Sequence, residues 1–110
     1  MKSGKPIKKT DKELWALIDD RIANRMYLFK EHAKKRLEER KIIDLAVLNI
    51  LRNKLKRKRK KSKDKYESPH MDWNYCIEGN DIDDKKTRII VSFNKQLMLI
   101  ITAMHIHLGK

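Results

Sequence analysis

The sequence predicts an α+β fold, with N-terminal helices packed on a three- to four-stranded antiparallel sheet. Two patterns support this class: apolar residues recur at helical spacing in the first half of the chain, and after Ser68 and Pro69 they recur at the two-residue period of strands. The 110 residues are enough for one modest core but not for two. We therefore expect a single domain over residues 10–108, preceded by a polar, disordered tail at residues 1–9.

Three helices are expected in the first half of the chain. Thr10 and Glu13 form a capping box that begins the first, and Asp44 is the expected N-cap of the third. The short apolar stretch at residues 26–29 fits either a strand or the start of a helix. The expected helices cover residues 11–24, 31–41 and 44–53.

Three strands are expected in the second half, at residues 73–78, 87–93 and 97–104. The first alternates apolar with polar residues, and the last is apolar on both faces, which favours a central position in the sheet. A two-residue hairpin turn at residues 94–95 pairs Phe93 with Gln96. In that register Arg88 lies opposite Ile101.

The positive charge is concentrated in one segment. The chain has 28 basic and 15 acidic residues, a net charge of +13, and ten of the basic residues lie at residues 52–65. This excess indicates a polyanionic partner, bound through phosphates without reading sequence. Like charges four residues apart repel, so we expect part of this basic connection to be a mobile loop, although it can also prolong the third helix by a turn or two. A solubilising loop is the alternative. The expected RNA-binding residues are Arg52, Lys54, Lys56, Arg57, Lys58, Arg59, Lys60 and Lys61, with Trp73 as a base-stacking residue.

Several classes of protein are disfavoured. The single cysteine, Cys76, allows no internal disulfide, and we expect it to be a small half-buried residue of a strand. The longest apolar run, residues 97–101, is too short to span a bilayer. Residues with convincing metal-ligand spacing are lacking, as are nucleotide-binding glycine motifs. We therefore expect a cytoplasmic protein with no metal, no cofactor and no membrane partner.

The second helix carries a candidate site. His32, Arg36 and Arg40 recur every four residues, which places them along one strip away from the apolar residues of the helix. Two guanidinium groups can bind a phosphate bidentately. His32 lies in the first helical turn, where the helix dipole and the arginines disfavour the imidazolium, so a neutral ring is available to accept a proton.

These residue types suit metal-free cleavage of RNA. That reaction needs a base for the 2′-hydroxyl proton, cations for the phosphorane and an acid for the departing 5′-oxygen. Trp73 and Tyr75 offer surfaces on which an unpaired base can stack. The candidates are His32 or Glu39 for the base, Arg36, Arg40 and Arg88 for the phosphate, and Tyr75 or His105 for the acid or an orienting group.

Each candidate also has a purely structural interpretation. A histidine and two arginines on a charged helix commonly form a solvated face. Trp73 and Tyr75, two residues apart in a strand, are commonly part of a core. An ion pair with the aspartates of the preceding loop would account for Arg88.

Residues 32–42 read HAKKRLEERKI, and a WNYCIEG strand, an RIIV strand and a last strand with Thr102 follow. This order resembles the small domains with a His-Ala-x-x-Arg-hydrophobic-x-x-Arg-x-Ile motif that are encoded beside YgiT-type zinc-finger antitoxins, and more distantly the toxins MqsR and BrnT. The chain differs at Lys41, where the family usually has Gly, and in its longer, more basic connection. The resemblance implies a RelE-like fold and selects as site residues His32, Arg36, Arg40, Arg88 and Thr102.

The resemblance further implies a type II toxin that cleaves messenger RNA, that is, a metal-independent endoribonuclease. The expected partners are RNA, including ribosome-associated mRNA, and a cognate antitoxin, for which a YgiT-type zinc-finger protein is one candidate. The alternative is a non-catalytic RNA- or DNA-binding module whose cations only hold phosphates. A third hypothesis is a regulatory protein that pairs an exposed strand edge with another chain.

Overall fold

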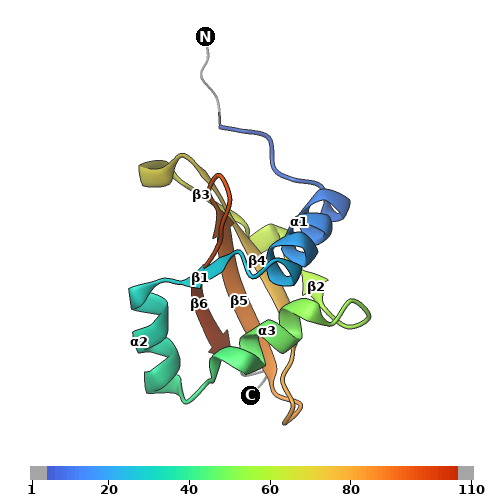
Figure 1. Ribbon diagram of the computed structural model, residues 1–110, viewed down its shortest axis with the longest axis vertical. Helices are drawn as coiled ribbons and strands as arrows, with labels where there is room; N and C mark the ends of the chain where they lie inside the picture. Colours follow the sequence, from blue (N-terminus) through green and yellow to red (C-terminus); the bar gives the residue numbers. More distant parts are fainter. Residues whose placement is uncertain (1–4, 107–110) are drawn as a thin grey trace.

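A computed structural model describes residues 5–106 and confirms the α+β class (Figure 1). Residues 5–106 contain three helices and six strands, with two short 3₁₀ turns at Lys61–Lys63 and Ser68–His70. The helices are α1 (Asp11–Ala23), α2 (Glu31–Arg40) and α3 (Asp44–Arg52). The strands are β1 (Tyr27–Phe29), β2 (Lys58–Arg59), β3 (Lys65–Glu67), β4 (Asp72–Asn80), β5 (Lys86–Phe93) and β6 (Met98–His105).

The sheet is mixed and mostly antiparallel. Its strand order is β1-β6-β5-β4-β2, and β3 pairs with another part of β4. The long strands β4, β5 and β6 form the predicted antiparallel centre, while β1 runs parallel to β6. The predicted sheet of three to four antiparallel strands was therefore incomplete, because the three short strands at its edges depend on pairing partners distant in the sequence.

The turn between β5 and β6 differs from the predicted two-residue hairpin. It comprises residues 94–97, and Phe93 pairs with Met98. The side-chain oxygen of Asn94 accepts hydrogen bonds from the backbone N–H groups of two residues in the turn, at 2.9 and 3.2 Å. This local bonding stabilises the longer turn.

A β-bulge shifts the register further along the same hairpin. The pairing of β5 with β6 is irregular between Ile90 and Val91. Arg88 consequently lies opposite Met104, and the predicted pairing with Ile101 was wrong. The bulge and the longer turn together displace the register by three residues.

The helix ends follow the sequence with one exception. Thr10 and Glu13 form the predicted capping box, with backbone-to-side-chain bonds of 2.8 and 3.2 Å. The N-cap of α3 is Ile43, so Asp44 is the first helical residue and makes no capping bond. An acidic residue there still interacts favourably with the helix dipole, which explains the sequence signal.

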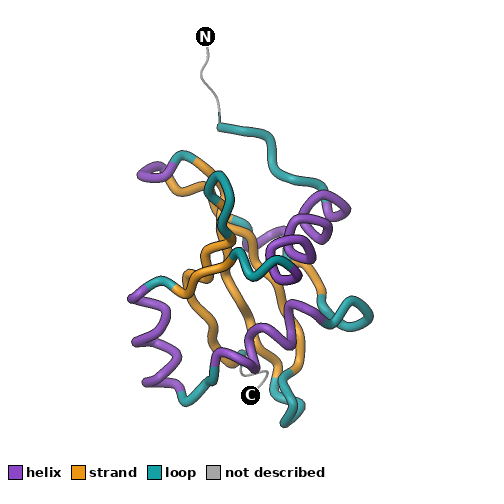
Figure 2. The backbone as a smooth tube through the Cα atoms, viewed as in Figure 1, coloured by secondary structure: helices purple, strands orange, loops and turns teal. Residues whose placement is uncertain are grey.

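The hydrophobic core lies on one face of the sheet. Figure 1 shows α1 and α3 in front of the strands and α2 beside β6, and Figure 2 shows the same arrangement along the backbone. Alternate residues of the long strands point toward these helices. Gly79 allows α3 to approach the sheet closely, because a Cβ there would lie 2.7 Å from the Ile50 side chain of α3. The core contribution of the long strands is Tyr75, Ile77, Ile89, Val91, Phe93, Met98, Ile100 and Ala103.

The basic connection is folded rather than a helical extension or a loop. α3 ends at Arg52, a turn follows, and β2 then pairs antiparallel with β4. The backbone N–H of Lys60 adds a bond of 2.8 Å to the carbonyl of Cys76. The hydrogen bonds between β2 and β4 stabilise an extended backbone in the connection, although repulsion between its like charges favours a loop.

The start of the described chain lies against the sheet. The indole N–H of Trp73 donates to the carbonyl of Pro6 at 2.7 Å, and the N–H of Lys9 donates to the Tyr75 hydroxyl at 3.1 Å. Residues 5–9 of the predicted tail therefore make defined contacts, while residues 1–4 lie outside the described residues. Residues 107–108 of the predicted domain also lie outside them. Within residues 5–106, each helix is too short or too polar to cross a membrane.

Candidate functional site

The candidate site lies on the face of the sheet opposite the core. Strand register aligns Glu78, Arg88 and Met104 in one row across β4, β5 and β6. The neighbouring row is Cys76, Ile90 and Thr102. The core cluster is formed by the other face, against which the helices pack. We call this second surface the open face, because the three helices do not pack on it. Its residues in the long strands include Cys76, Glu78, Arg88, Ile90, Thr102 and Met104, of which Cys76 and Glu78 are buried.

Arg40 joins helix α2 to the open face. Its Nη1 donates to the Thr102 hydroxyl at 3.1 Å and to the Ala103 carbonyl at 2.8 Å. This contact forms because β1 pairs with β6 only as far as Ile100, beyond which α2 lies beside the edge of β6. Within residues 5–106, Nε and Nη2 of Arg40 make no hydrogen bond, so one edge of the guanidinium remains able to bind an anion bidentately.

His32 and Arg36 form a second pair on the same helix. The Nε of Arg36 donates to Nε2 of His32 at 3.3 Å, and both side chains are exposed. The ring of His32 therefore presents Nε2 as an acceptor on the side that faces Arg36. The predicted strip of three residues is present, although His32 and Arg40 are about 12 Å apart along the helix axis.

Arg88 is held by an acid that the sequence interpretation missed. Its Nε and Nη2 lie 3.0 and 2.9 Å from the same oxygen of Glu78, which is 6% exposed. Lys86 lies 3.6 Å from the other oxygen of that carboxylate. The proposed partner of Arg88 in the acidic loop was therefore wrong. The alternation of apolar and polar residues in this strand places Glu78 on the face away from the core. Its pairing with Arg88 can be known only from the register of β4 against β5.

Tyr75 is not brought together with Arg40 and Thr102. It is 1% exposed on the core face, and its hydroxyl accepts the hydrogen bond from Lys9. Burial raises the pKa of this hydroxyl, partly offset by that hydrogen bond, so it remains protonated at neutral pH. His105 also lies apart, with its Nε2 3.2 Å from a carboxylate oxygen of Asp81.

Trp73 is half-buried rather than presented as an open platform. Its ring contacts Tyr66 edge-to-face at 5.7 Å between centroids. The ammonium group of Lys8 lies 4.7 Å from the centre of the Trp73 ring, in the range of a cation–π contact. The N-terminal segment therefore occupies part of the surface on which we expected a base to stack.

Two arginines of the basic connection are part of the fold. Arg59, whose side chain is 2% exposed, contacts the buried carboxylate of Asp64 at 2.8 Å and Asp11 at 2.9 Å. Arg57 contacts Asp19 through two bonds of 2.6 and 3.2 Å and lies 4.5 Å from the centre of the Trp15 ring. Carboxylates from α1 already bind both guanidinium groups, so these two arginines are engaged within the fold, and their predicted binding of phosphates stays a prediction.

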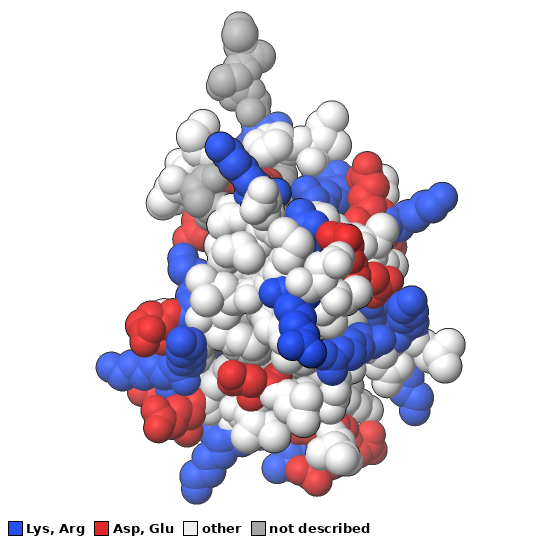
Figure 3. Space-filling view, in the orientation of Figure 1, with Lys and Arg blue, Asp and Glu red and all other residues white. Residues whose placement is uncertain are grey.

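The remaining basic residues of the connection are exposed. Lys54 makes only a long contact of 3.9 Å with Asp19, and Arg52 makes a 3.5 Å bond to Asn49. Figure 3 shows Lys and Arg side chains gathered near the turn that follows α3. The exposed set is Arg52, Lys54, Lys56, Lys58, Lys60, Lys61, Lys63 and Lys65.

Nucleophilic chemistry by the cysteine is disfavoured. Cys76 is fully buried, and burial raises the pKa of its thiol to about 11, so the reactive thiolate is scarce at neutral pH. Among the described residues, His, Cys, Asp and Glu side chains do not form a group of three suited to a metal ion.

Comparison with known proteins identifies a family but no characterised relative. Searches of the curated proteins and of the solved structures found no match to the chain. One family model does match and is described as a domain of unknown function. The match runs from the last residue of β1 to the end of β6. It includes the α2 strip, the basic connection and the open face. The chain therefore belongs to the DUF4258 family, whose model matches residues 29–105.

Proposed function

We propose that this chain is a metal-independent endoribonuclease, the toxin of a type II toxin–antitoxin pair, which cleaves messenger RNA beside α2. The observation that carries the proposal is the contact of Arg40 with Thr102. It connects the helix strip to the sheet while leaving one edge of the Arg40 guanidinium for a phosphate. The resemblance of residues 32–42 to toxin-linked domains supports the biological role.

The free groups on α2 suit phosphate recognition followed by proton transfer. The unbonded edge of Arg40 and the Nη groups of Arg36 bind the non-bridging oxygens and stabilise the charge of the phosphorane. The Nε2 of His32 accepts the proton of the 2′-hydroxyl, exchanging its bond from Arg36 for one from the substrate. The 2′-oxygen then displaces the 5′-oxygen, leaving a 2′,3′-cyclic phosphate and a 5′-hydroxyl.

The structural positions refine the other proposed roles. Thr102 acts as a positioning residue, because its hydroxyl accepts from Arg40. Arg88 contributes to the electrostatic potential of the open face and does not bind the phosphate directly, because Glu78 already binds its guanidinium group. The candidate acids Tyr75 and His105 lie outside this group, so we propose that solvent protonates the departing 5′-oxygen.

The remaining parts of the proposal concern fold and partners. We propose that the architecture is RelE-like and related to that of MqsR and BrnT, with helices on one face of the sheet and RNA on the other. The substrate is cytoplasmic mRNA, including mRNA on the ribosome. A cognate antitoxin, for which a YgiT-type zinc-finger protein is a candidate, inhibits the toxin by covering this surface.

A non-catalytic RNA- or DNA-binding module is the second candidate function. The pairing of Arg88 with Glu78 favours it, because a neutralised cation contributes less to stabilising a phosphorane. The exposed lysines of the basic connection would still bind phosphates in such a module. The two functions differ in whether bound RNA is cut.

The test is controlled expression of the wild type beside His32→Ala, Arg36→Ala and Arg40→Ala variants, with growth and RNA integrity as readouts. We expect wild type to arrest growth and each variant to lower the cleavage rate by about 10²- to 10³-fold, as for loss of one transition-state contact. Lys35→Ala, also exposed on α2, is the matched control and should retain wild-type activity.

The outcomes separate the function from the residues. Intact RNA and normal growth with wild-type protein present would contradict the nuclease proposal, and RNA binding without cleavage would then favour the binding module. Cleavage by all three variants at the wild-type rate would contradict the site assignment alone. Mass spectrometry of the fragment ends distinguishes a 2′,3′-cyclic phosphate from the products of hydrolysis by another route.

A further inference from the structure

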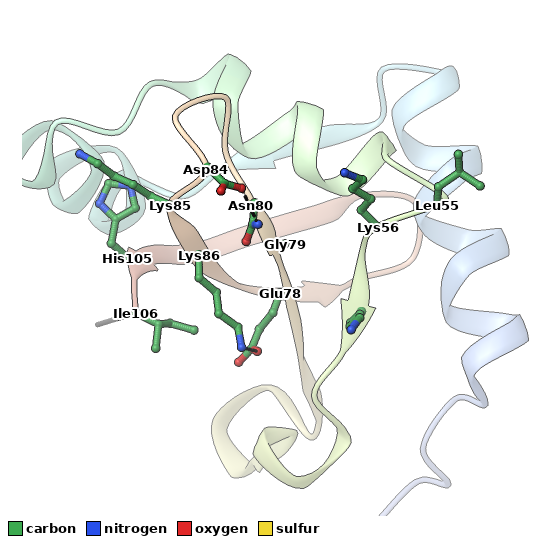
Figure 4. A pocket seen from close by; sticks show the side chains of 11 residues that line it. Leu55, Lys56, Glu78, Gly79, Asn80, Asp84, Lys85, Lys86, His105 and Ile106 are labelled. Carbon is green, nitrogen blue, oxygen red and sulfur yellow. Dashed lines mark hydrogen bonds and ion pairs between the residues drawn. The ribbon is translucent and has the colours of Figure 1, made fainter. Parts of the chain in front are cut away.

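A lysine-lined cavity lies at the end of the open face, next to the Arg88–Glu78 ion pair. It has a volume of about 840 Å³ and is bounded by the turn after α3, by β2, by the loop between β4 and β5 and by the end of β6 (Figure 4). A cavity of this size is in the range of small-molecule and nucleotide sites. Its lysines come from two separate stretches of the chain and are Lys56, Lys58, Lys85 and Lys86.

The backbone fixes where these lysines stand. The N–H of Lys56 donates to the side-chain oxygen of Asn53 at 3.2 Å, which closes the turn after α3. The backbone of Lys58 lies opposite that of Glu78 in the antiparallel pairing of β2 with β4. The N–H of Lys85 donates to Asp81 at 2.9 Å. Hydrogen bonds and strand register therefore set the backbone positions from which these lysine side chains extend.

The cavity has an excess of positive charge. Two carboxylates line it, those of Glu78 and Asp84, against the four lysines. Glu78 is bound by Arg88 and Lys86, and Asp84 accepts a bond of 2.8 Å from the Asn80 amide. In the part of the chain that the structure describes, Lys56, Lys58 and Lys85 form no ion pair. Several ammonium groups without acidic partners repel one another when they line one cavity, and a bound anion would reduce this repulsion.

We infer that this cavity is a phosphate-binding subsite for the single-stranded RNA that the α2 site acts on. The inference rests on the proposed function for the identity of the strand. Ile106, at the cavity wall and directly after the end of β6, lies four residues beyond Thr102, which is about 13 Å at the usual rise of a strand. Its N–H still bonds to the Lys86 carbonyl at 2.8 Å, so the strand geometry continues to that point. The open face thus connects the reacting phosphate to a second one.

The chemistry of the subsite favours an RNA backbone of any sequence. Lysine ammonium groups act as point charges and do not impose the planar geometry that arginine does. A flexible polyanion can follow such charges from strand to strand, whereas base-specific contacts are not required. The subsite therefore supplies affinity for phosphates flanking the cleavage position and does not select the base.

The experiment measures binding of a fluorescent, 2′-O-methylated 12-nucleotide single strand, which lacks the attacking hydroxyl, by anisotropy over a range of NaCl concentrations. The test variant is Lys58→Gln with Lys85→Gln, one from β2 and one from the loop between β4 and β5. The control is Lys12→Gln with Lys95→Gln, which removes the same charge from exposed sites elsewhere. We expect the slope of log affinity against log salt to become shallower by about 0.7 per lost phosphate contact in the test variant alone.

Equal affinities and equal slopes for the test and control variants would overturn the inference. A test variant that binds the oligonucleotide like the control but binds a poly-glutamate peptide more weakly would also overturn it, in favour of an acidic protein partner. Far-ultraviolet circular dichroism and urea midpoints verify that both double variants are folded. Because the probe cannot be cleaved, failure of the nuclease proposal would appear only in the RNA cleavage assay and leaves this measurement intact.

Discussion

Helix α2 and the basic connection at residues 52–65 are both rich in cations, yet the fold uses them differently. In the connection, Arg57 and Arg59 are nearly buried and bound by carboxylates of α1 and Asp64. On α2, Arg40 is anchored by uncharged groups, a hydroxyl and a carbonyl. An arginine bound to carboxylates stabilises the fold, while one bound through uncharged oxygens keeps its charge for a ligand.

The contrast teaches that charge density in the sequence does not measure the charge available for binding. The two buried arginines of the densest segment contact acids of α1 at sequence separations of 38 and 48, and Arg59 also contacts Asp64 within the segment itself. Within residues 5–106, the arginines of α2, although fewer positive charges surround them, keep guanidinium N–H groups that no carboxylate binds, unlike Arg57 and Arg59. Four predictions test this difference, from the largest expected effect to the smallest.

Replacing Arg59 with alanine should give the largest loss of stability. Asp64, whose side chain is fully buried, would lose its principal cation, and breaking a buried ion pair costs about 3–5 kcal/mol. The midpoint of urea unfolding measures the effect. Lys60→Ala, an exposed neighbour, should change the free energy of unfolding by less than about 0.5 kcal/mol. Similar losses in the two variants would contradict the division between structural and available cations.

Replacing Arg57 with alanine should cost about 2 kcal/mol, the range for hydrogen bonds between charged groups. The loss is smaller because Asp19 is 32% exposed and water can replace part of the contact. A double-mutant cycle with Asp19→Ala isolates the pair, and a clear coupling energy is expected. Strictly additive effects would show that Arg57 stabilises the fold through Trp15 rather than through Asp19.

Replacing Lys41 with glycine should stabilise α2 by about 1 kcal/mol. Lys41 ends the helix with φ of 57°, a left-handed conformation that costs residues with a Cβ about this much. Thermal or urea unfolding measures the gain. Lys35→Gly, in the middle of the same helix, is the control and should lose about 1 kcal/mol. A loss in both variants would disprove the conformational explanation.

The smallest effect concerns Asp81, whose carboxylate accepts the backbone N–H of Lys85 at 2.9 Å. Burial alone would raise the pKa of Asp81, but hydrogen bonds from Lys85, Asp83 and His105 outweigh it and lower that pKa. A carboxyl with a lowered pKa stabilises the fold above its ordinary pKa, and this contribution disappears as pH falls through the lowered value.

Comparing wild type with Asp81→Asn from pH 7 to pH 2 checks this small contribution. The wild type should be more stable at neutral pH, and the two stabilities should converge as pH falls below about 4, the ordinary pKa of aspartate. A stability difference that is constant across the range would exclude an effect of the Asp81 charge.

Much of the candidate site was visible in local sequence. The four-residue spacing of His32, Arg36 and Arg40 fixes their common strip, because an α-helix has 3.6 residues per turn. Thr102 entered only through the resemblance, and its contact with Arg40 spans 62 residues. Glu78 was missed because an acid in a strand has no distinctive pattern until its cross-strand neighbour is known.

The sequence by itself determined the α+β class, the positions of the helices, the three long strands and the net charge of +13. These features follow from the periodicity of apolar residues and from local capping, which act over a few residues. The tertiary structure decided the register after the β5–β6 turn, the short edge strands and which cations of the connection are bound by the acids of α1. Each of these depends on groups far apart in the chain, because an ion pair or a strand pairing exists only where folding brings both partners together.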